Sequence, residues 1–106
     1  MSGIVSVYTV FGSDEEARRI GREMVELQLA ACVNILGACH SIYRWQGEVQ
    51  EADEVAAIFK TTAAAAPELV RRIAASHSYD VPAAVIWPIS DLPDNYRLWV
   101  EQNSRR

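Results

Sequence analysis

The sequence has few cysteines, no excess of basic residues and no long apolar run, and each absence excludes a class of protein. Its 106 residues include two cysteines, too few for the disulfide framework of a small secreted domain. We therefore expect reduced thiols and a cytoplasmic protein. The net charge is -4 and no basic stripe occurs, which disfavours nucleic-acid binding.

The amino terminus and the apolar segments argue against export and membrane insertion. Residues 1–5 contain neither the basic nor the apolar region of a signal peptide. No apolar run approaches the roughly 20 residues with which a helix crosses a bilayer. The length predicts one domain over residues 1–106, with a core so modest that subunit contacts would help to stabilise it.

Hydrophobic periodicity predicts strands and helices in alternation. Ile4–Val10 is rich in β-branched residues and is predicted to form a buried strand. Ser13 and Glu16 have the spacing of a capping box, at the start of a helix over about 14–29. Pro67 is suited to the first turn of a second helix.

The middle of the chain is predicted to form a long β-hairpin. β-prone residues cover 31–45, with Gly37 marking a bend or bulge inside the strand. Gln46–Gly47 supplies a tight turn, and the return strand covers 48 to about 62. Each arm approaches about 15 residues, whereas a typical strand has about 5 or 6. Such a ribbon exposes backbone and apolar side chains, so we expect it to pair with another subunit.

A last strand over 83–87 and a short terminal helix around Tyr96, Trp99 and Val100 complete the pattern. The order β-α-β-β-α-β predicts an α+β, ferredoxin-like fold with a long central hairpin and a short C-terminal helix. Right-handed crossovers would place the first two helices on one face of a four-stranded antiparallel sheet.

Four motifs in order along the chain resemble a known family. They are Leu29–Ile35, Ser41–Gly47, Lys60–Thr62 and His77–Pro82. The series is similar to the CutA family, the divalent-cation tolerance proteins, over nearly the whole chain. The resemblance implies a fold close to that of the PII signalling proteins and a tight homotrimer, with hairpins crossing to neighbouring subunits.

The resemblance also implies a role in tolerance of copper and other divalent cations, with direct metal binding in some members. It brings no agreed catalytic activity. Two departures from the family pattern occur. Ser78 stands where a proline is usual, which is expected to loosen the position of His77. Residues 7–9 lack the cysteine that some copper-binding members carry in the first strand.

His77, Cys32 and Cys39 are the candidate metal ligands, because Cu(I) prefers thiolates and Cu(II) prefers imidazole nitrogen. Cys32 has a competing interpretation as a core residue. Regular alternation would put the two thiols on opposite strand faces unless a bulge at Gly37 restores a common face. Cys39 with His40 forms a candidate surface ligand pair. His77 either caps the second helix or binds a metal or anion between subunits.

Further positions shared with the family are expected to line a ligand cleft, namely Lys60, Tyr79, Asp80 and Arg44. Lys60 either faces an anionic ligand or pairs with Asp80 or with an acidic residue of the next subunit. The residues expected to pack in the trimer are Tyr43, Trp45 and Trp99.

The acidic arm of the hairpin has two interpretations. Its carboxylates are Glu48, Glu51, Asp53 and Glu54. They either hold a hard divalent ion or form a solvated or arginine-paired strand face that discourages edge pairing.

The sequence therefore predicts a trimeric protein of the response to divalent metal ions that binds Cu(II) or a similar cation and no organic cofactor. The alternative is a PII-like signalling or scaffold trimer that binds a small ligand or a protein between subunits. Catalysis is not expected, because the sequence contains neither a nucleophile with its base nor a glycine-rich phosphate loop.

Overall fold

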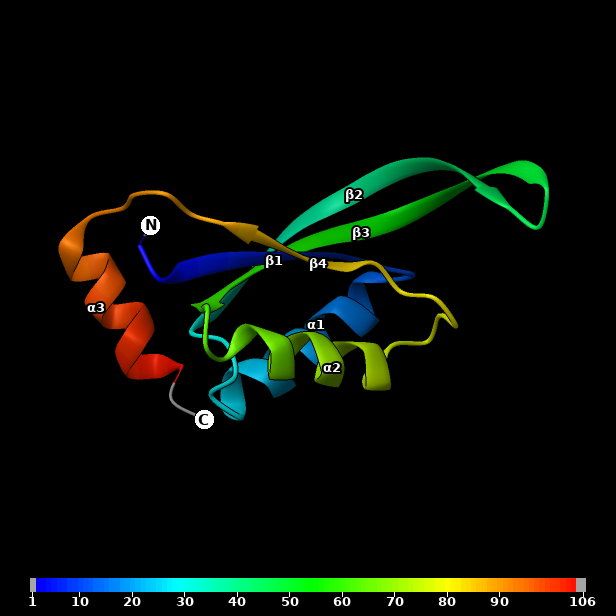
Figure 1. Cartoon of the computed structure of the whole chain (residues 1–106). Coiled ribbons are helices and arrows are strands. Elements are labelled where there is room, and N and C mark those ends of the chain that lie inside the picture. The colour runs from blue at the N-terminus through cyan, green and yellow to red at the C-terminus, as the bar shows by residue number, and fades with distance from the viewer. Residues whose placement is uncertain (1, 105–106) are drawn as a thin grey trace.

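Two helices cover one face of a four-stranded antiparallel sheet, and a long hairpin projects from its edge (Figure 1). The computed structural model describes residues 2–104, in which the sheet order is β2-β3-β1-β4. The elements are β1 (Ile4–Phe11), α1 (Asp14–Glu26), β2 (Cys32–Trp45), β3 (Glu48–Thr62), α2 (Ala66–Ser76), β4 (Ala84–Pro88) and α3 (Asp94–Asn103). The ferredoxin-like α+β fold is confirmed.

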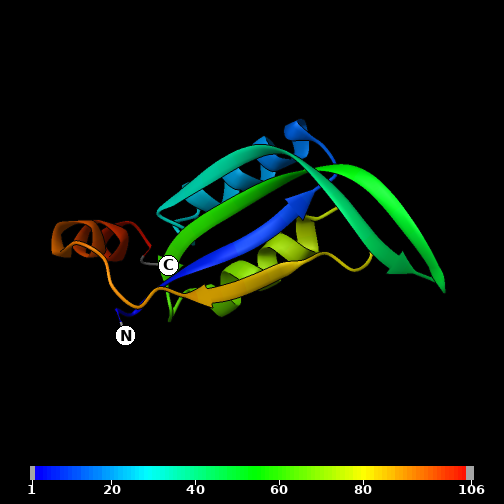
Figure 2. The same cartoon turned by 90° about the horizontal axis from the view of Figure 1, so that it is seen from above.

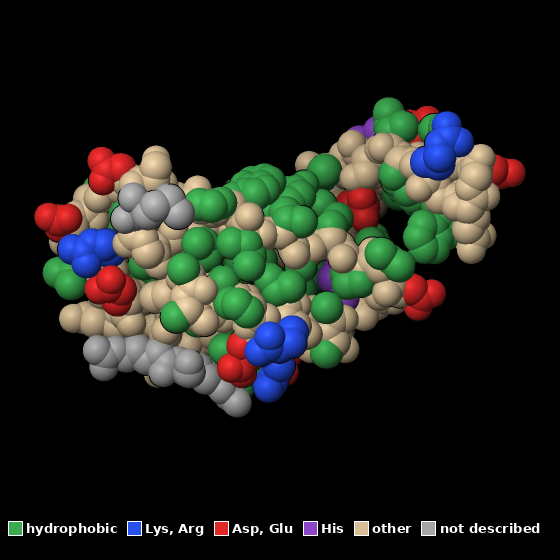
Figure 3. All heavy atoms as spheres, viewed as in Figure 1, with side chains coloured by type: hydrophobic (Ala, Val, Ile, Leu, Met, Phe, Trp, Pro, Cys, Tyr) green, Lys and Arg blue, Asp and Glu red, His purple; other side chains and the backbone are tan. Residues whose placement is uncertain are grey.

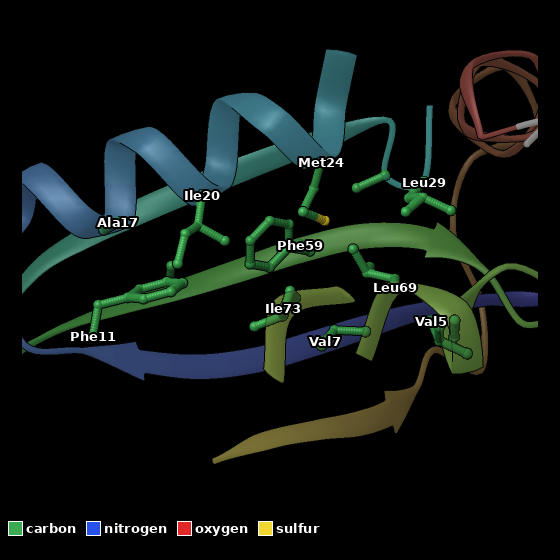
Figure 4. Packing of buried hydrophobic residues seen from close by; sticks show 13 residues of the cluster. Val5, Val7, Phe11, Ala17, Ile20, Met24, Leu29, Phe59, Leu69 and Ile73 are labelled. Atoms are coloured by element: carbon green, nitrogen blue, oxygen red, sulfur yellow. The ribbon is translucent and has the colours of Figure 1, made fainter. Parts of the chain in front are cut away.

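The core lies between the sheet and the pair α1 and α2. Alternate residues of β1, such as Val7, face the helices, as does Phe59 of β3. They meet Ile20 and Met24 of α1 and Ile73 of α2, and all five are fully buried (Figure 4). Burial of each such side chain contributes on the order of 1.5–3 kcal/mol.

Helix α1 begins as the sequence predicts and ends earlier than expected. The Ser13 hydroxyl accepts a hydrogen bond from the Glu16 N–H at 3.1 Å, which confirms the N-cap. The helix ends at Glu26, and Gln28 adopts a left-handed φ of 60°. That turn brings Leu29 into the core, where it is fully buried. Tertiary burial therefore decides the end of the helix.

The hairpin of β2 and β3 has the expected length, bulge and turn. Ile35 pairs with Ala57 while Gly37 pairs with Ala56, so Leu36 is one extra residue in β2. At the tip, residues 46 and 47 have φ values of 51° and 83°. Two successive positive φ values are typical of a type I′ turn, which matches the twist of the flanking strands.

The other face of the sheet carries no helix (Figure 2). Tyr8 and Trp87 stack on this face with ring centroids 4.8 Å apart, and Trp87 is 47% exposed. Helix α3 lies beyond one end of the sheet and buries Val100 against Ile4 and Ala31. No helix among the described residues is long and apolar enough to cross a membrane.

Candidate functional site

A buried carboxylate anchors the segment after α2 to the start of α1. Glu16 is 5% exposed, and its Oε1 accepts hydrogen bonds from the Gly12 N–H at 3.2 Å and the Ser78 hydroxyl at 3.1 Å. Its Oε2 accepts from the Ser78 N–H at 2.7 Å. Burial acts to raise the pKa of Glu16, but the hydrogen bonds from Ser78 and Gly12 outweigh it and the pKa is lowered. The carboxylate therefore stays charged and holds Ser78 in place.

Ser78 does not loosen its neighbours, contrary to the expectation from the sequence. Its N–H and its hydroxyl both donate to the Glu16 carboxylate. A proline at this position would have no N–H to donate. In this chain, hydrogen bonding to α1 replaces the rigidity that a proline ring would supply.

His77 uses both ring nitrogens inside the chain. Nε2 lies 2.8 Å from the carbonyl oxygen of Val10, which can only accept, so Nε2 carries the proton. Nδ1 accepts from the Tyr79 N–H at 3.1 Å. The side chain is fully buried and its ring stacks on Phe11 at a centroid distance of 5.0 Å. His77 therefore offers no lone pair to a metal and instead positions Tyr79.

Tyr79 reaches across to the hairpin and closes one side of a cavity. Its hydroxyl donates to Glu54 Oε2 at 2.8 Å. Burial, followed by this hydrogen bond and the Glu54 charge, raises the pKa of Tyr79 to about 12, so the phenol stays protonated. The cavity, with a volume of about 310 Å³, is a hollow between the hairpin and the body of the molecule (Figure 3). Its lining residues are Tyr43, Trp45, Gln50, Glu54, Tyr79, Asp80 and Val81.

Strand register brings the hairpin residues of the cavity to one face. Tyr43 pairs with Gln50 across the hairpin, and directly opposed residues point to the same side. Trp45 and Glu54 lie at even spacings from these two along their strands, so they share that side. The site is therefore built by one face of the ribbon and by the segment that Glu16 anchors.

Two of the four predicted cleft residues lie elsewhere. Lys60 lies six positions from Glu54 along β3, or about 20 Å at the usual rise of a strand. Its Nζ donates to Asn34 Oδ1 at 3.5 Å. Arg44 donates to the Gly47 carbonyl at 3.2 Å, at the hairpin tip. Within one chain, Lys60 and Arg44 therefore lie apart from Tyr79 and Asp80. Their place in a cleft between subunits stays a prediction.

The three predicted metal ligands are not brought together. The bulge does restore a common face, because Cys32 and Cys39 oppose Lys60 and Glu54, which share a face of β3. The same register separates the two thiols by about 20 Å along the ribbon. Cys39 and His40 are neighbours on a regular strand and point to opposite faces, so they cannot ligate one ion as a pair. No group of three metal-ligating side chains occurs within residues 2–104.

The acidic arm contains a contact that the sequence analysis missed. His40 Nε2 lies 2.7 Å from Glu51 Oε1, and Nδ1 lies 2.9 Å from Asp53 Oδ1. Hydrogen bonds to Glu51 and then Asp53 raise the pKa of this exposed imidazole. The signal was present in the sequence, because a turn at Gln46–Gly47 places residue 40 opposite residue 53.

The residues expected to pack in a trimer are accessible. Tyr43, Trp45 and Trp99 are each about two-fifths exposed. Trp99 stacks on Tyr96 and lines an open groove together with Cys32, between α1 and the edge strand β2. Their packing against another subunit stays a prediction.

Comparison with known proteins identifies the family. The family model described as "CutA1 divalent ion tolerance protein" matches residues 5–103. The chain is 47% identical over 92 residues to the "Divalent-cation tolerance protein CutA" of Thermus thermophilus, covering 87% of this chain and 89% of that protein. It is 34% identical to "Protein CutA, chloroplastic" of Arabidopsis thaliana, covering 95% of this chain and 56% of that longer protein.

A solved structure agrees with the sequence relatives. The "Periplasmic divalent cation tolerance protein CutA" of Archaeoglobus fulgidus superposes with a TM-score of 0.93 at 32% identity, covering 96% of this chain and 99% of that chain. The names of the Thermus and Archaeoglobus relatives describe divalent-cation tolerance proteins rather than enzymes. The resemblance drawn from the four sequence motifs is confirmed. The chain belongs to the CutA family of divalent-cation tolerance proteins.

Proposed function

We propose that the protein acts in the tolerance of divalent cations as a homotrimer that binds Cu(II) or a similar cation at sites shared between protomers. One observation carries the oligomer: the sheet face without helices and the projecting ribbon both expose large apolar side chains. Among them, Ile42 is 66% exposed and Trp87 is 47% exposed. Apolar patches of this kind support association, and long ribbons in particular favour pairing with other chains.

The metal part of the proposal depends on ligands from more than one chain. Within the described residues one protomer assembles no three-ligand cluster. Cys39 is half-buried and offers its thiol on one face of the ribbon. His40 is exposed on the other face and offers a ring nitrogen once its contact with Glu51 or Asp53 is released. A thiolate or an imidazole from one protomer, completed by donors of a second, has the ligand chemistry that copper prefers.

Sedimentation equilibrium tests the assembly. A homotrimer has three times the chain mass of 11.8 kDa. A species of one chain mass at micromolar concentration would contradict the proposal.

Isothermal titration with Cu(II) and with Zn(II) tests the metal part. We expect saturable Cu(II) binding that Cys39→Ser or His40→Asn weakens, while Cys32→Ser, about 20 Å away along the ribbon, leaves it unchanged. An absence of saturable binding, or equal loss in the Cys32 variant, would refute the shared site.

A second candidate function is that of a PII-like trimer that responds to a small ligand. The preformed cavity beside Tyr79 favours it, because the chain already fixes one wall through Glu16 and His77. A ligand that binds the folded state raises the melting temperature. In a screen of metabolites, we expect some compounds to raise the melting temperature of the wild type and of Lys60→Ala, but not that of Tyr79→Phe. If no compound raises the melting temperature of the wild type, this function is contradicted.

We further propose a non-catalytic role in the cytoplasm, without nucleic-acid or membrane partners. The names of the relatives support a non-catalytic role. The two free thiols support the cytoplasm, and the net charge of -4 argues against nucleic-acid partners. Since relatives are named for the chloroplast and the periplasm, cell fractionation is the appropriate test of the compartment.

A further inference from the structure

The cavity beside Tyr79 has a negatively charged, aromatic lining. Two carboxylates, Glu54 and Asp80, line it, and no lysine or arginine does. Its volume of about 310 Å³ lies at the lower end of the range for ligand pockets. A space of this size holds roughly ten water molecules. The dimensions suit a small molecule, and the charge disfavours an anion.

Glu54 is buried without a cation. It is 8% exposed, and among residues 2–104 it forms no ion pair with lysine, arginine or histidine. Within residues 2–104, the side chain of Glu54 has one hydrogen-bond partner, the Tyr79 hydroxyl, which donates to Oε2 and not to Oε1. A buried carboxylate is costly unless a charge or several donors compensate it. The other oxygen, Oε1, is therefore available to a donor that enters the cavity.

The phenol that contacts Glu54 cannot supply the missing positive charge. Because the pKa of Tyr79 is raised to about 12, its hydroxyl remains a neutral donor across the physiological range. The backbone N–H of Tyr79 donates a hydrogen bond to His77 Nδ1, and the centroids of the two rings lie 4.7 Å apart. The wall is thus rigid before any ligand arrives, which lowers the entropic cost of binding.

The remaining lining groups favour an organic cation over a bare metal ion. Tyr43, Trp45 and Tyr79 offer aromatic rings, which attract cations through the ring quadrupole and also pack against an alkyl stem. A hard metal ion prefers several oxygen ligands at once. Within residues 2–104 no cluster of three metal-ligating side chains forms here or elsewhere.

We propose that this cavity binds a small organic cation with N–H donors on a short alkyl stem, an alkylammonium or alkylguanidinium compound. The N–H groups donate to Glu54, the stem packs on the aromatic rings, and Asp80 adds attraction from the loop. The inference rests on the small-ligand function proposed above and assigns the chemical class of that ligand.

The test is isothermal titration of the full-length protein with n-butylguanidinium and with n-butylurea, its neutral counterpart of similar shape. We expect saturable binding of the guanidinium and none of the urea. Glu54→Gln keeps an acceptor for Tyr79 but removes the charge, and should weaken binding about tenfold or more. Glu48→Gln is the matched control, because Glu48 is an exposed carboxylate of the same strand outside the cavity lining. Binding in this variant should be unchanged.

Several outcomes would overturn the proposal. These are no saturable binding of the guanidinium, equal binding of the urea, or equal losses in the Glu54 and Glu48 variants. If Glu54→Gln does not fold, Asp80→Asn replaces it, with an expected loss of a few-fold because Asp80 is exposed. A neutral or anionic metabolite whose binding depends on Tyr79 would refute the cation class while leaving the small-ligand function standing. If no metabolite raises the melting temperature and the guanidinium compound does not bind, both the small-ligand function and the cation class are refuted.

Discussion

Replacing the buried Glu16 by glutamine should remove more stability than the same change at the exposed carboxylates of α1, such as Glu15. The one oxygen of glutamine can still accept the hydrogen bond from the Ser78 N–H. Its amide nitrogen then lies against the Gly12 N–H, and because both groups are donors, that hydrogen bond is lost. Hydrogen bonds to a charged group contribute about 1.5–3 kcal/mol each. Losing one and weakening the others predicts a loss of about 2–3 kcal/mol, or about 8–12 °C in melting temperature for a domain of this size.

Thermal and urea unfolding of the two proteins at equal concentration measure this loss. Glu15→Gln is the control, because Glu15 is exposed and its ion pair with Arg19, at 3.5 Å, is worth at most about 1 kcal/mol. A difference below about 0.5 kcal/mol between Glu16→Gln and the wild type would refute the anchoring role of the carboxylate.

The pH dependence provides a second check on Glu16. Folding lowers the pKa of this carboxyl, so its contribution is complete above the unfolded pKa, about 4.3, and is lost as pH falls through the folded pKa. The gap in stability between wild type and Glu16→Gln should therefore be largest near neutral pH and should narrow below about pH 4. A gap that stays constant down to pH 2 would contradict the assignment.

Three other predictions follow from local geometry. In NMR titrations the His40 imidazole should have a pKa above its usual value, and the double change of Glu51 and Asp53 to their amides should return it toward normal. An unshifted wild-type titration would contradict the two contacts. Ser78→Pro should lower stability by about 1 kcal/mol more than Ser78→Ala, because it removes the N–H donor as well as the hydroxyl. His77 already has the extended backbone that a residue before proline requires, so backbone strain should not add to this loss. Equal stabilities of Ser78→Pro and Ser78→Ala would therefore argue against the contact of the Ser78 N–H. Gly47→Val should lower stability by about 1 kcal/mol or more, since φ is 83° at that position, and a neutral effect would contradict the turn type.

Local patterns in the sequence were sufficient to predict the elements of the fold. Ser13 marks the start of α1, and Gly47 marks the hairpin turn, because each encodes a backbone requirement of its own neighbourhood. The end of α1 was not predicted, since burial of Leu29 rather than helix propensity ends it.

The candidate site depends on contacts that local patterns do not encode. Glu16 and Ser78 are 62 residues apart, and Glu54 and Tyr79 are 25 apart. Each pair meets only once the sheet and helices are in place. Lys60 matched the family as well as Tyr79 did, yet it lies about 20 Å from Glu54 along β3. Motif matching therefore selected relevant residues without showing which of them share a site.

The extra residue at Leu36 works as a phase shift in the alternation of side chains. If Leu36 instead paired regularly with Ala56, every residue of β2 beyond it would slip by one partner and change sides relative to β3. Tyr43 and Trp45 would then turn away from Glu54, and the cavity would lose its aromatic wall. Deleting Leu36 would leave the pairs from Gly37 to the turn in place, so the unpaired state of this residue, not the length of β2, decides on which side of the ribbon the protein can hold a ligand.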